Sequence, residues 1–374
     1  MTTIWFNQGY SVVRDAILLI RDGAAAAGVG AVARQAESPG GLASATTLDT
    51  GLQLLASHAD FQANVLEAAD LGFLEPPIDR STPDGSREYA AWCAGRCEEL
   101  RVDLFLVQGG QHAIASNLNL FPASTRVVLP APPHILEEIA DKGLFYTRAL
   151  AAGIPMPWTR TVANVAEFDA ACEDLAKRAL PACIKPREGV FGAGFWRLDP
   201  AYGLLDALMG GDRRRVAPAM VRQAIATATR PVRLLAMEYL PGPEWSLDCV
   251  CDQGRLVVGV ARRKRGRVQE LEVDGPIFAM AREAVELFDL SGLINVQFKA
   301  ADADGEDPRL LEINPRMSGG VARTRFAGVN LPWRHVAMLL GRQMEADVPV
   351  GGALIATRET GFTISGRARE VGHV

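Results

Sequence analysis

The chain has 374 residues, of which 48% are hydrophobic and 22% are charged. This composition excludes a disordered chain and is typical of a globular protein with two or three domains. A formal net charge of −5 argues against a general nucleic-acid-binding protein, although it leaves room for a local basic patch.

Cysteine usage and the N-terminal sequence indicate a soluble cytoplasmic protein. The six cysteines form no CxxC pair and have no histidine partners at zinc spacing, so we expect reduced thiols. The first residues, MTTIWFNQGY, lack the basic start and apolar stretch of a signal peptide. The longest uncharged run, 105–125, contains glutamines, asparagines and a histidine and would be a poor membrane span.

The first part of the chain alternates short apolar strands with helical patterns, which predicts a parallel sheet with helices on its faces. The expected elements are a helix at Val12–Ile20 and strands at Thr3–Phe6, Val29–Ala33, Asp103–Val107 and Arg126–Leu129. Ligands bind at the carboxyl ends of strands in such sheets. The loops 7–9 and 108–110 are therefore candidate substrate walls, with simple tight turns an equal alternative.

Prolines 130, 132 and 133 mark a linker, after which we expect one helix over His134–Ala152. Asn164 with Glu167 resembles a capping box that opens the next helix. From Leu235 onward the pattern is mainly β, with a hairpin turn at 252–255. The elements expected there are the helix Pro276–Leu290 and the strands Ala182–Lys185, Leu235–Leu240, Trp245–Cys251, Leu256–Ala261, Leu293–Lys299 and Arg309–Asn314.

The last two expected strands carry a candidate metal site. Alternation places Gln297 on the polar face of one strand, and Glu312 and Asn314 on the polar face of the other. If the strands pair antiparallel, these three oxygen ligands converge and suit Mg²⁺ rather than zinc. Arg316 follows and could reach a phosphoryl or carboxylate group with two hydrogen bonds. An ordinary sheet with a solvated polar face explains the same pattern equally well.

Two further segments could bind a nucleotide. The glycine-rich segment 185–197 is neither a Walker A loop nor a GxGxxG fingerprint, but a strand-ending lysine followed by glycines can cradle phosphates. A glycine-rich hairpin without a ligand is the commoner case. The strand that ends at Pro241-Gly242 could expose edge backbone groups to an adenine, with Glu238 and Glu244 serving an amino group and ribose hydroxyls.

The basic run 262–267 admits three interpretations: a nucleic-acid-binding segment, a solvated face, or one or two side chains that face an anionic reaction centre. We favour the last, because the rest of the chain is acidic and no aromatic residues are interleaved with the basic ones.

Taken in order, these segments resemble the ATP-grasp superfamily over residues 125–345. The matching pieces are Asp141-Lys142, Ile184-Lys185-Pro186 with the glycine loop, EYLPGPE at 238–244, Asn295-Val296-Gln297-Phe298 and Leu311-Glu312-Ile313-Asn314-Pro315-Arg316. The Gln…Glu-x-Asn-x-Arg pattern looks most like the large chain of carbamoyl phosphate synthetase. The EYLPGPEWSLD stretch looks like stand-alone carboxylate–amine ligases of that branch.

The resemblance implies an α/β protein with an ATP-grasp fold, in which two α+β subdomains grip ATP, preceded by a Rossmann-like parallel-sheet domain. The implied domains are a Rossmann-like domain at 1–125, an ATP-grasp domain at 126–345 and a C-terminal extension at 346–374 that packs on the grasp. Within the grasp, the lid subdomain would span about 154–235 and the metal-binding subdomain about 236–345.

The resemblance also implies a role for each matching residue. Lys142 and Lys185 would hold ATP phosphates under a lid that contains Gly189, Gly192 and Gly194. The nucleoside would be read by Glu238 at the adenine amino group, by backbone groups of Tyr239 and Leu240, and by Glu244 at the ribose. Mg²⁺, or Mn²⁺ as a substitute, would be held by Gln297, Glu312 and Asn314. The catalytic residues would be Arg316, Lys185 and Arg263. The neutral Gln297 replaces the family's usual second acidic ligand, which leaves the number of Mg²⁺ ions open.

The expected activity is that of an ATP-dependent ligase that activates a carboxylate as an acyl phosphate for attack by an amine or a thiol. An ATP-grasp carboxylase, a carboxylate kinase and a non-catalytic nucleotide sensor are the alternatives. The expected partners are small-molecule carboxylate and amine substrates and a second copy in a homodimer, with no nucleic acid and no membrane. Candidate substrate contacts are Asn7, Gln8, Gln108, His112, Arg262 and Arg263.

Overall fold

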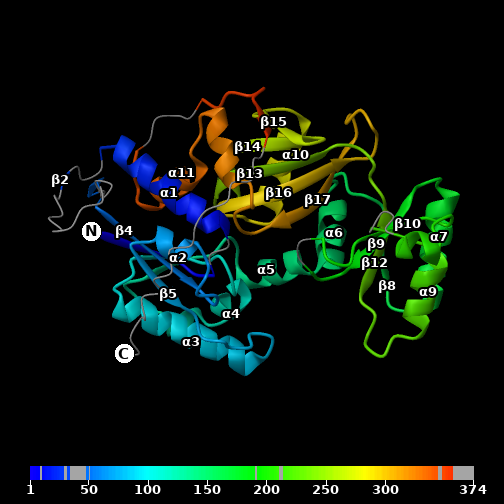
Figure 1. The fold of residues 1–374 in the computed structure, drawn as a ribbon, viewed down its shortest axis with the longest axis horizontal. Coiled ribbons are helices and arrows are strands. Elements are labelled where there is room, and N and C mark those ends of the chain that lie inside the picture. Colours follow the sequence, from blue (N-terminus) through cyan, green and yellow to red (C-terminus); the bar gives the residue numbers. More distant parts are fainter. Residues whose placement is uncertain are drawn as a thin grey trace.

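The computed structural model describes residues 1–8, 11–28, 32–33, 48–49, 51–189, 192–209, 214–343 and 348–356. These residues form three sheets of five or six strands, arranged in a row along the long axis of the molecule, with helices packed on their faces (Figure 1). A further two-stranded pairing joins β2 (Val32–Ala33) to β3 (Leu48–Asp49). None of the helices formed by the described residues is long and apolar enough to cross a membrane.

The first sheet is parallel throughout, in the strand order β5-β4-β1-β6-β7. Its strands are β1 (Thr2–Phe6), β4 (Leu52–His58), β5 (Leu71–Leu74), β6 (Leu104–Leu106) and β7 (Arg126–Val128). The helices of this part are α1 (Ser11–Ala26), α2 (Val65–Ala68), α3 (Pro83–Glu99), α4 (Gln111–Ala115) and the 3-10 turn η1 (Leu118–Leu120). The predicted parallel-sheet domain is confirmed.

Alternation along β1 explains why helices cover both faces of this sheet. Ile4 and Phe6 point to one face and pack with buried residues of α1, whereas Trp5 points to the other and packs with buried residues of α3. The Trp5 ring stacks on Phe105 of β6 with ring centroids 4.2 Å apart. A strand buried on both faces needs apolar residues at successive positions, which is why Ile4–Phe6 of β1 and Leu104–Leu106 of β6 are continuous apolar runs.

Two helices, α5 (Pro133–Ala140) and α6 (Lys142–Ala151), lead out of the first sheet where the sequence predicted one. The break falls at Asp141, whose extended backbone interrupts the helix. Its carboxylate accepts hydrogen bonds from the backbone N–H groups of Gly143 and Leu144, which are unpaired donors of the first turn of α6. The prediction of a single helix was therefore wrong, because an apolar stripe does not reveal an internal cap.

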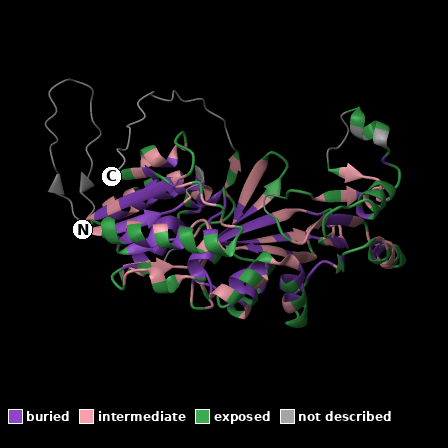
Figure 2. Ribbon diagram, turned by 90° about the horizontal axis from the view of Figure 1, so that it is seen from below, coloured by how far each residue is buried: buried purple, intermediate pink, exposed green. Residues whose placement is uncertain are grey.

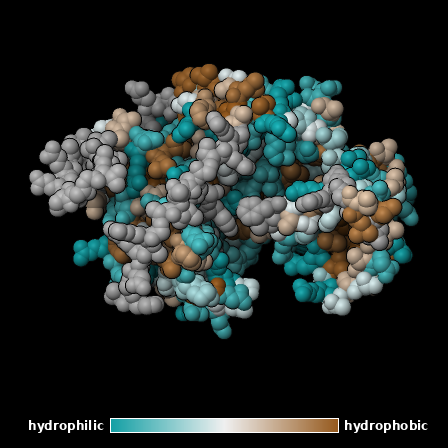
Figure 3. Space-filling model, in the orientation of Figure 1, coloured by the Kyte–Doolittle hydropathy of each residue, from teal (hydrophilic) through white to brown (hydrophobic). Residues whose placement is uncertain are grey.

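The second sheet belongs to a smaller lobe, where the lid subdomain was expected, and has the strand order β11-β10-β9-β12-β8. We refer to it as the lid sheet. Its elements are β8 (Thr159–Val162), α7 (Val165–Lys177), β9 (Ala182–Pro186), β10 (Trp196–Leu198), α8 (Leu204–Leu208), β11 (Arg215–Val216), α9 (Pro218–Ala226) and β12 (Leu234–Glu238). Asn164 caps α7 by accepting a hydrogen bond from the Glu167 N–H at 2.9 Å, as the sequence predicted. Figure 3 shows an indentation between this lobe and the rest of the molecule.

The third and largest sheet is antiparallel, in the strand order β17-β16-β13-β14-β15-β18. Its strands are β13 (Glu244–Asp252), β14 (Arg255–Arg265), β15 (Val268–Glu272), β16 (Gly292–Ala300), β17 (Pro308–Asn314) and β18 (Leu354–Ala356). The accompanying helices are α10 (Pro276–Leu287), the 3-10 helix η2 (Val321–Ala327) and α11 (Leu331–Leu339).

The predicted C-terminal extension is described only at 348–356, and its remainder lies outside the described residues. Within it, β18 pairs with β15, so this part of the extension joins the edge of the large sheet.

Apolar cores lie on both faces of the large sheet. On one face, Leu247 and Val296 pack with α10 and with Phe145 of α6. On the other, Val250 packs with α11 and with α1 of the first domain. Figure 2 shows buried residues concentrated in the strands and in the helix faces against them.

Close packing of α1 against α11 fixes the first domain on the large sheet. A Cβ atom on Gly23 would come within 2.3 Å of the Trp333 ring, so only glycine permits this approach.

Candidate active site

Polar side chains replace apolar ones toward one end of the large sheet. In the antiparallel register, Gln297 of β16 lies opposite Ser246 of β13 and opposite Glu312 of β17. Directly opposed residues of neighbouring strands share a face, so these three side chains form a row on one face. The neighbouring row on the same face consists of Asp248, Asn295 and Asn314.

The three predicted metal ligands, Gln297, Glu312 and Asn314, lie side by side. The Asn314 Nδ2 donates to Glu312 Oε1 at 3.2 Å. Both Gln297 Nε2, at 3.3 Å, and Asn314 Nδ2, at 3.4 Å, donate to Asn295 Oδ1. The structure thus brings these side chains together as the alternation indicated, while their role as metal ligands stays a prediction.

The chemistry of this group fits a hard cation. Across the described part of the chain, no three His, Cys, Asp or Glu side chains gather as a metal site. A cation at this place would therefore depend on carboxamide oxygens beside the Glu312 carboxylate. Oxygen ligands with a single formal charge suit Mg²⁺, which retains water molecules and shares positions with phosphate oxygens.

The two predicted phosphate-binding lysines lie at the junction of α6 and the lid sheet. Lys142 begins α6, and its Nζ donates to the Gly189 carbonyl at 2.7 Å. Lys185 lies on β9, and its Nζ donates to the Tyr146 hydroxyl at 2.8 Å. The pKa of Lys185 is lowered to about 8, chiefly because burial removes the ammonium group from water. Within that net shift the Glu312 charge raises the pKa and the Lys142 charge lowers it. Lys185 therefore responds to the charges of both Lys142 and Glu312.

Tyr146 was missed by the sequence reasoning. Its hydroxyl accepts from Lys185 Nζ and donates to the Leu311 carbonyl of β17 at 2.8 Å, so it joins the lid sheet to the large sheet. Burial raises the pKa of this hydroxyl, which keeps it a neutral donor. One signal was available: Tyr146 follows Lys142 by one helical turn and so shares its face of α6.

Asp141 fixes the start of α6 against the end of β9. Besides capping the helix, its Oδ1 accepts from Arg187 Nε at 2.6 Å, and the Lys142 N–H donates to the Arg187 carbonyl at 3.0 Å. Hydrogen bonds from Arg187 and from the first turn of α6 outweigh partial burial and lower the pKa of Asp141. The ionised cap holds Lys142 next to the glycine loop.

The glycine loop has the backbone conformation that glycine permits. Gly189, Gly192 and Gly194 have φ values of +145°, +63° and +72°, which disfavour residues with a Cβ atom. A Cβ on Gly194 would also lie 2.6 Å from Pro186 Cγ. Residues 190 and 191 of the predicted lid lie outside the described residues.

The predicted adenine-binding segment lies where β12 leaves the lid sheet. One oxygen of the Glu238 carboxylate already has a hydrogen-bond partner, because Oε2 accepts from the Trp158 N–H at 3.1 Å. The Tyr239 N–H donates to the Pro181 carbonyl at 2.6 Å, and Leu240 is buried. The Tyr239 N–H therefore already has a hydrogen-bond acceptor within the protein.

Glu244, the predicted ribose ligand, begins β13 on the face that carries Ser246 and Gln297. Its Oε1 accepts from Lys264 Nζ at 2.5 Å, an ion pair whose lysine is exposed. This position agrees with a residue at the mouth of the site, although its ribose role stays a prediction.

Arg316 lies close to the metal candidates and to the first domain. Its N–H donates to the Asn314 carbonyl at 2.7 Å, and its Nη1 donates to the Met317 carbonyl at 3.1 Å. Gln111 of α4 donates to the neighbouring Pro315 carbonyl at 2.6 Å. Arg316 and Gln108 also line one small pocket, so the carboxyl edge of the first sheet meets the end of β17.

The structure does not bring Arg263 into this group. In the register, Arg263 lies opposite Trp245 and therefore on the other face from Ser246 and Gln297. Its guanidinium lies over the Trp245 ring and donates to the Asp304 carbonyl at 3.0 Å. The first four residues of the basic run lie in β14, which extends to Arg265, beyond the predicted strand end at Ala261. Alternation within the strand could have separated Arg263 from Arg262.

Arg262 lies on the site face, two residues before Lys264, and it is only 5% exposed. It pairs with Asp248, which is fully buried, at 2.9 Å. Asp248 was missed by the sequence reasoning, although Glu244, Ser246 and Asp248 are polar at every second position of β13.

The candidate substrate contacts of the first domain divide into two kinds. Asn7 is fully buried: its Nδ2 donates to Tyr89 Oη and to the Gly109 carbonyl, and its Oδ1 accepts from the Gln108 N–H. Its side chain holds the loop 108–110 in place. The Gln8 N–H donates to the buried Glu75 carboxylate, and exposed His112 pairs with Glu137 at 2.7 Å.

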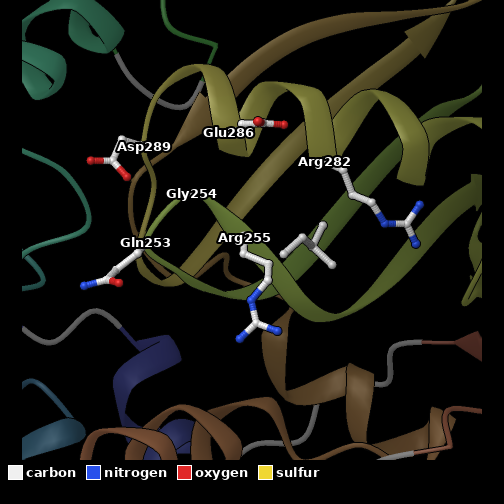
Figure 4. Close-up of a pocket in the computed structure, with 7 residues that line it drawn as sticks. Gln253, Gly254, Arg255, Arg282, Glu286 and Asp289 are labelled. Atoms are coloured by element: carbon white, nitrogen blue, oxygen red, sulfur yellow. The ribbon is translucent and has the colours of Figure 1, made fainter.

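A separate surface pocket lies at the far end of β13. Its lining residues come from the β13–β14 turn, the start of β14, α10 and the residues just after that helix (Figure 4). They are Gln253, Gly254, Arg255, Leu256, Arg282, Glu286 and Asp289. The six residue steps from Ser246 to Asp252 correspond to about 20 Å of extended strand, so this pocket is distant from the metal candidates.

Comparisons with known proteins agree with this geometry. Residues 230–361, which contain the metal candidates, match a family model described as ATP-grasp in the biosynthetic pathway with Ter operon. None of the curated proteins matches the chain. An N5-carboxyaminoimidazole synthetase from Staphylococcus aureus complexed with ADP is similar at a TM-score of 0.59 and 14% identity, over 92% of this chain and 78% of that one.

Two further solved structures are similar. The L-amino acid ligase from Bacillus licheniformis aligns at a TM-score of 0.55 and 14% identity, over 90% of this chain and 73% of that one. A biotin carboxylase–ATP complex from Campylobacter jejuni aligns at 0.58 and 15%, over 92% and 72%.

The fold is therefore that of the ATP-grasp superfamily, in which a lid lobe faces a larger sheet, preceded here by a parallel-sheet domain. Recognition of this superfamily from its ordered motifs is confirmed. Within it, the segment that carries the candidate metal ligands matches the ATP-grasp family associated with the Ter operon.

Proposed function

We propose that the protein is an ATP-dependent ligase that activates a carboxylate as an acyl phosphate and joins it to an amine or a thiol. One observation carries the proposal: Lys185 of the lid sheet donates to the Tyr146 hydroxyl, which donates to the Leu311 carbonyl of the large sheet, one residue before Glu312. Two lobes that present a lysine and an acidic, amide-rich group to the same space form a site for a nucleotide polyphosphate with its metal.

Different residues would bind the metal ion, the phosphates and the nucleoside. Glu312, Gln297 and Asn314 would hold Mg²⁺, with Mn²⁺ as a substitute, and the bound ion would neutralise charge on phosphate oxygens. Lys142 and Lys185 would hold the phosphates from the lid side. The adenine and ribose would lie against Glu238, Tyr239, Leu240 and Glu244, under the loop of Gly189, Gly192 and Gly194.

The chemistry follows from the weakness of a carboxylate as an electrophile. A carboxylate oxygen attacks the γ-phosphorus of ATP, the bond to the bridging oxygen breaks, and ADP leaves with that electron pair. The amine nitrogen then attacks the acyl carbon, inorganic phosphate leaves, and the proton lost by the amine passes to phosphate or solvent. Arg316, at the end of β17, would stabilise the acyl phosphate.

Closure of the lid would protect the acyl phosphate from water. The glycine loop is well suited to close because Gly189, Gly192 and Gly194 have no Cβ atom to clash with a bound phosphate.

The names of the similar solved structures support the proposed class of reaction. The similar structures carry the names of a synthetase, an amino acid ligase and a carboxylase, and two of them were determined with ADP or ATP. The Gln297, Glu312, Asn314 and Arg316 pattern leads us to propose the carbamoyl phosphate synthetase-like branch, with stand-alone carboxylate–amine ligases as the working model.

We also propose the domain division 1–125, 126–345 and 346–374, with the lid at about 154–235 and the metal-binding subdomain at about 236–345. The separate sheets β8–β12 and β13–β18 support the two subdomains. A cytoplasmic location is supported by six cysteines that are all free thiols. The homodimer stays a prediction that sedimentation can test.

The proposal is tested by measuring ADP release while carboxylates and amines are supplied in pairs. We expect release that requires a particular carboxylate, and hydroxylamine in place of the amine should trap the acyl phosphate as a hydroxamate. Glu312→Ala is the matched inactive variant. Wild-type protein that binds no ATP and releases no ADP with any pair would refute the ligase proposal.

The same assay separates the alternatives. ADP release that requires bicarbonate would identify a carboxylase. ADP release with a carboxylate alone, and an acyl phosphate as the final product, would identify a carboxylate kinase. ATP binding with turnover equal to that of Glu312→Ala would identify a nucleotide sensor.

A further inference from the structure

Two of the three proposed metal ligands are carboxamides, and a carboxamide binds a cation through only one of its two ends. The oxygen is a ligand, whereas the NH₂ group is a donor that repels a cation. A site built from Gln297 and Asn314 therefore works only if something fixes which end faces the metal. A carboxylate such as Glu312 has no such requirement, because both of its terminal atoms are oxygens.

The structure contains an acceptor that takes the NH₂ ends of both amides. Asn295 is fully buried; it lies opposite Asn314 and two residues before Gln297 on the same face. Its Oδ1 accepts from Gln297 Nε2 at 3.3 Å and from Asn314 Nδ2 at 3.4 Å. Asn314 Nδ2 also donates to Glu312 Oε1. Since both NH₂ groups point at acceptors, both carboxamide oxygens are left to face away from Asn295.

The orientation of Asn295 is itself fixed by its surroundings. Its Nδ2 donates to Ser246 Oγ at 2.9 Å, to the Leu247 carbonyl at 3.1 Å and to Asp248 Oδ1 at 3.1 Å. If the Asn295 amide were reversed, its oxygen would face a carbonyl and a carboxylate, which are acceptors only.

A buried ion pair completes the arrangement. Asp248 is fully buried, and its Oδ2 accepts from Arg262 Nε at 3.1 Å and Nη2 at 2.9 Å, which leaves Oδ1 for Asn295. Arg262 Nη2 also donates to Ser246 Oγ and to Ser318 Oγ, each at 2.8 Å. The guanidinium thus holds Asp248 rigidly, and Asp248 in turn holds Asn295.

We propose that Asn295, held by the Asp248–Arg262 ion pair, is a positioning residue that turns the carboxamide oxygens of Gln297 and Asn314 toward a bound divalent cation. This inference rests on the proposed function, because it assigns these residues to the metal of that site. It also gives Arg262 a role behind the site, where burial keeps it from contacting substrate.

The test measures Mn²⁺ affinity by electron paramagnetic resonance, with ADP present, in the wild type and in Asn295→Leu. Leucine has a similar size but neither accepts from the two amides nor donates to Asp248. We expect Mn²⁺ affinity to fall about ten- to a hundred-fold, the range seen when groups behind metal ligands are removed. Metal-free ADP affinity should stay within about twofold, which separates this loss from general damage to the nucleotide site.

A second background makes the test specific for orientation. Gln297→Glu supplies a ligand with oxygens at both ends, so part of the need for Asn295 disappears. Asn295→Leu should therefore cost at least about threefold less Mn²⁺ affinity in the Gln297→Glu background than in the wild type, a coupling of about 0.7 kcal/mol. An equal loss in both backgrounds would show a merely structural role and overturn the inference.

Asn295→Ser guards against loss of folding in the leucine variant, because serine is small and cannot reach both amides. It should weaken Mn²⁺ binding in the same way and with the same dependence on residue 297. Unchanged Mn²⁺ affinity in a folded Asn295 variant would overturn the inference and leave the ligase proposal standing. Wild-type protein that binds no Mn²⁺ with ADP present would overturn the metal site and the inference together.

Discussion

Replacing Tyr146 by phenylalanine tests whether Lys185 works as a charged group at the junction of the two lobes. The Tyr146 hydroxyl accepts from Lys185 Nζ and donates to the Leu311 carbonyl, both at 2.8 Å. Tyr146→Phe removes this acceptor and leaves Lys185 as desolvated as before. The lysine should then hold its proton less tightly.

The size of the effect follows from the pKa of Lys185, which burial has already lowered to about 8. A hydrogen bond to a charged group contributes about 1.5–3 kcal/mol, and 1.4 kcal/mol corresponds to about one pKa unit. The pKa of Lys185 in the variant should therefore be about 7 or below. Only the protonated lysine can hold phosphate, so activity is present below this pKa and is lost as the pH rises through it.

The assay is the pH profile of kcat/KM for ATP, which reports ionisations of the free enzyme. Its descending limb should move from near pH 8 in the wild type to about pH 7 in Tyr146→Phe. At pH 8 the protonated fraction would fall from about one half to about one tenth, a roughly fivefold loss, with little change at pH 6.

Tyr89→Phe is the matched control, because Tyr89 is also a buried hydroxyl but lies in the first domain, bonded to Asn7 and Glu75. It should lower stability by a similar amount without moving the limb. A limb that stays in place in Tyr146→Phe, or moves equally in Tyr89→Phe, would refute the reasoning.

Three other changes have outcomes that the structure predicts. Burial lowers the pKa of His335 to about 4, so as the pH falls the unfolded chain takes up a proton on this residue before the folded chain does. The free energy of unfolding should therefore fall by roughly 3 kcal/mol between pH 6.5 and pH 4. Denaturant unfolding of His335→Met should lack that loss, and an unchanged acid dependence would contradict this. Gly194→Ala adds a Cβ at φ +72° and 2.6 Å from Pro186, which strains the loop in the folded state. KM for ATP should therefore rise about five- to tenfold and the melting temperature should fall by a few degrees. Arg262→Met leaves Asp248 buried without its partner and should cost about 3–5 kcal/mol in denaturant unfolding, a prediction that a loss below about 1 kcal/mol would disprove.

Local patterns were sufficient for the parts of the site that lie on neighbouring strands. Alternation alone placed Gln297 and Glu312 on matching faces, because β16 and β17 follow one another and pair antiparallel. The capping box at Asn164 could also be predicted from the sequence, because it depends on a short-range hydrogen bond. The parallel first sheet could be predicted because its strands are short apolar runs.

Contacts between segments far apart in the chain could not be predicted from the sequence. Tyr146 meets Leu311 across 165 positions of sequence, and no local pattern specifies that pairing. The choice between Arg262 and Arg263 depended on the register of β14 against β13, which the basic run conceals because both residues look alike in sequence. Asn7 looked like a ligand contact because its burial and its bonds to the loop 108–110 arise only in the folded sheet.

The central claim is that Glu312 and its neighbouring amides hold the metal of a bound nucleotide. Calorimetric titration of ADP with and without Mg²⁺ tests it most directly, in the wild type, in Glu312→Ala and in the exposed control Glu306→Ala. Mg²⁺ should strengthen ADP binding in the wild type and in Glu306→Ala, and should give no gain in Glu312→Ala. An equal gain from Mg²⁺ in Glu312→Ala would contradict the account.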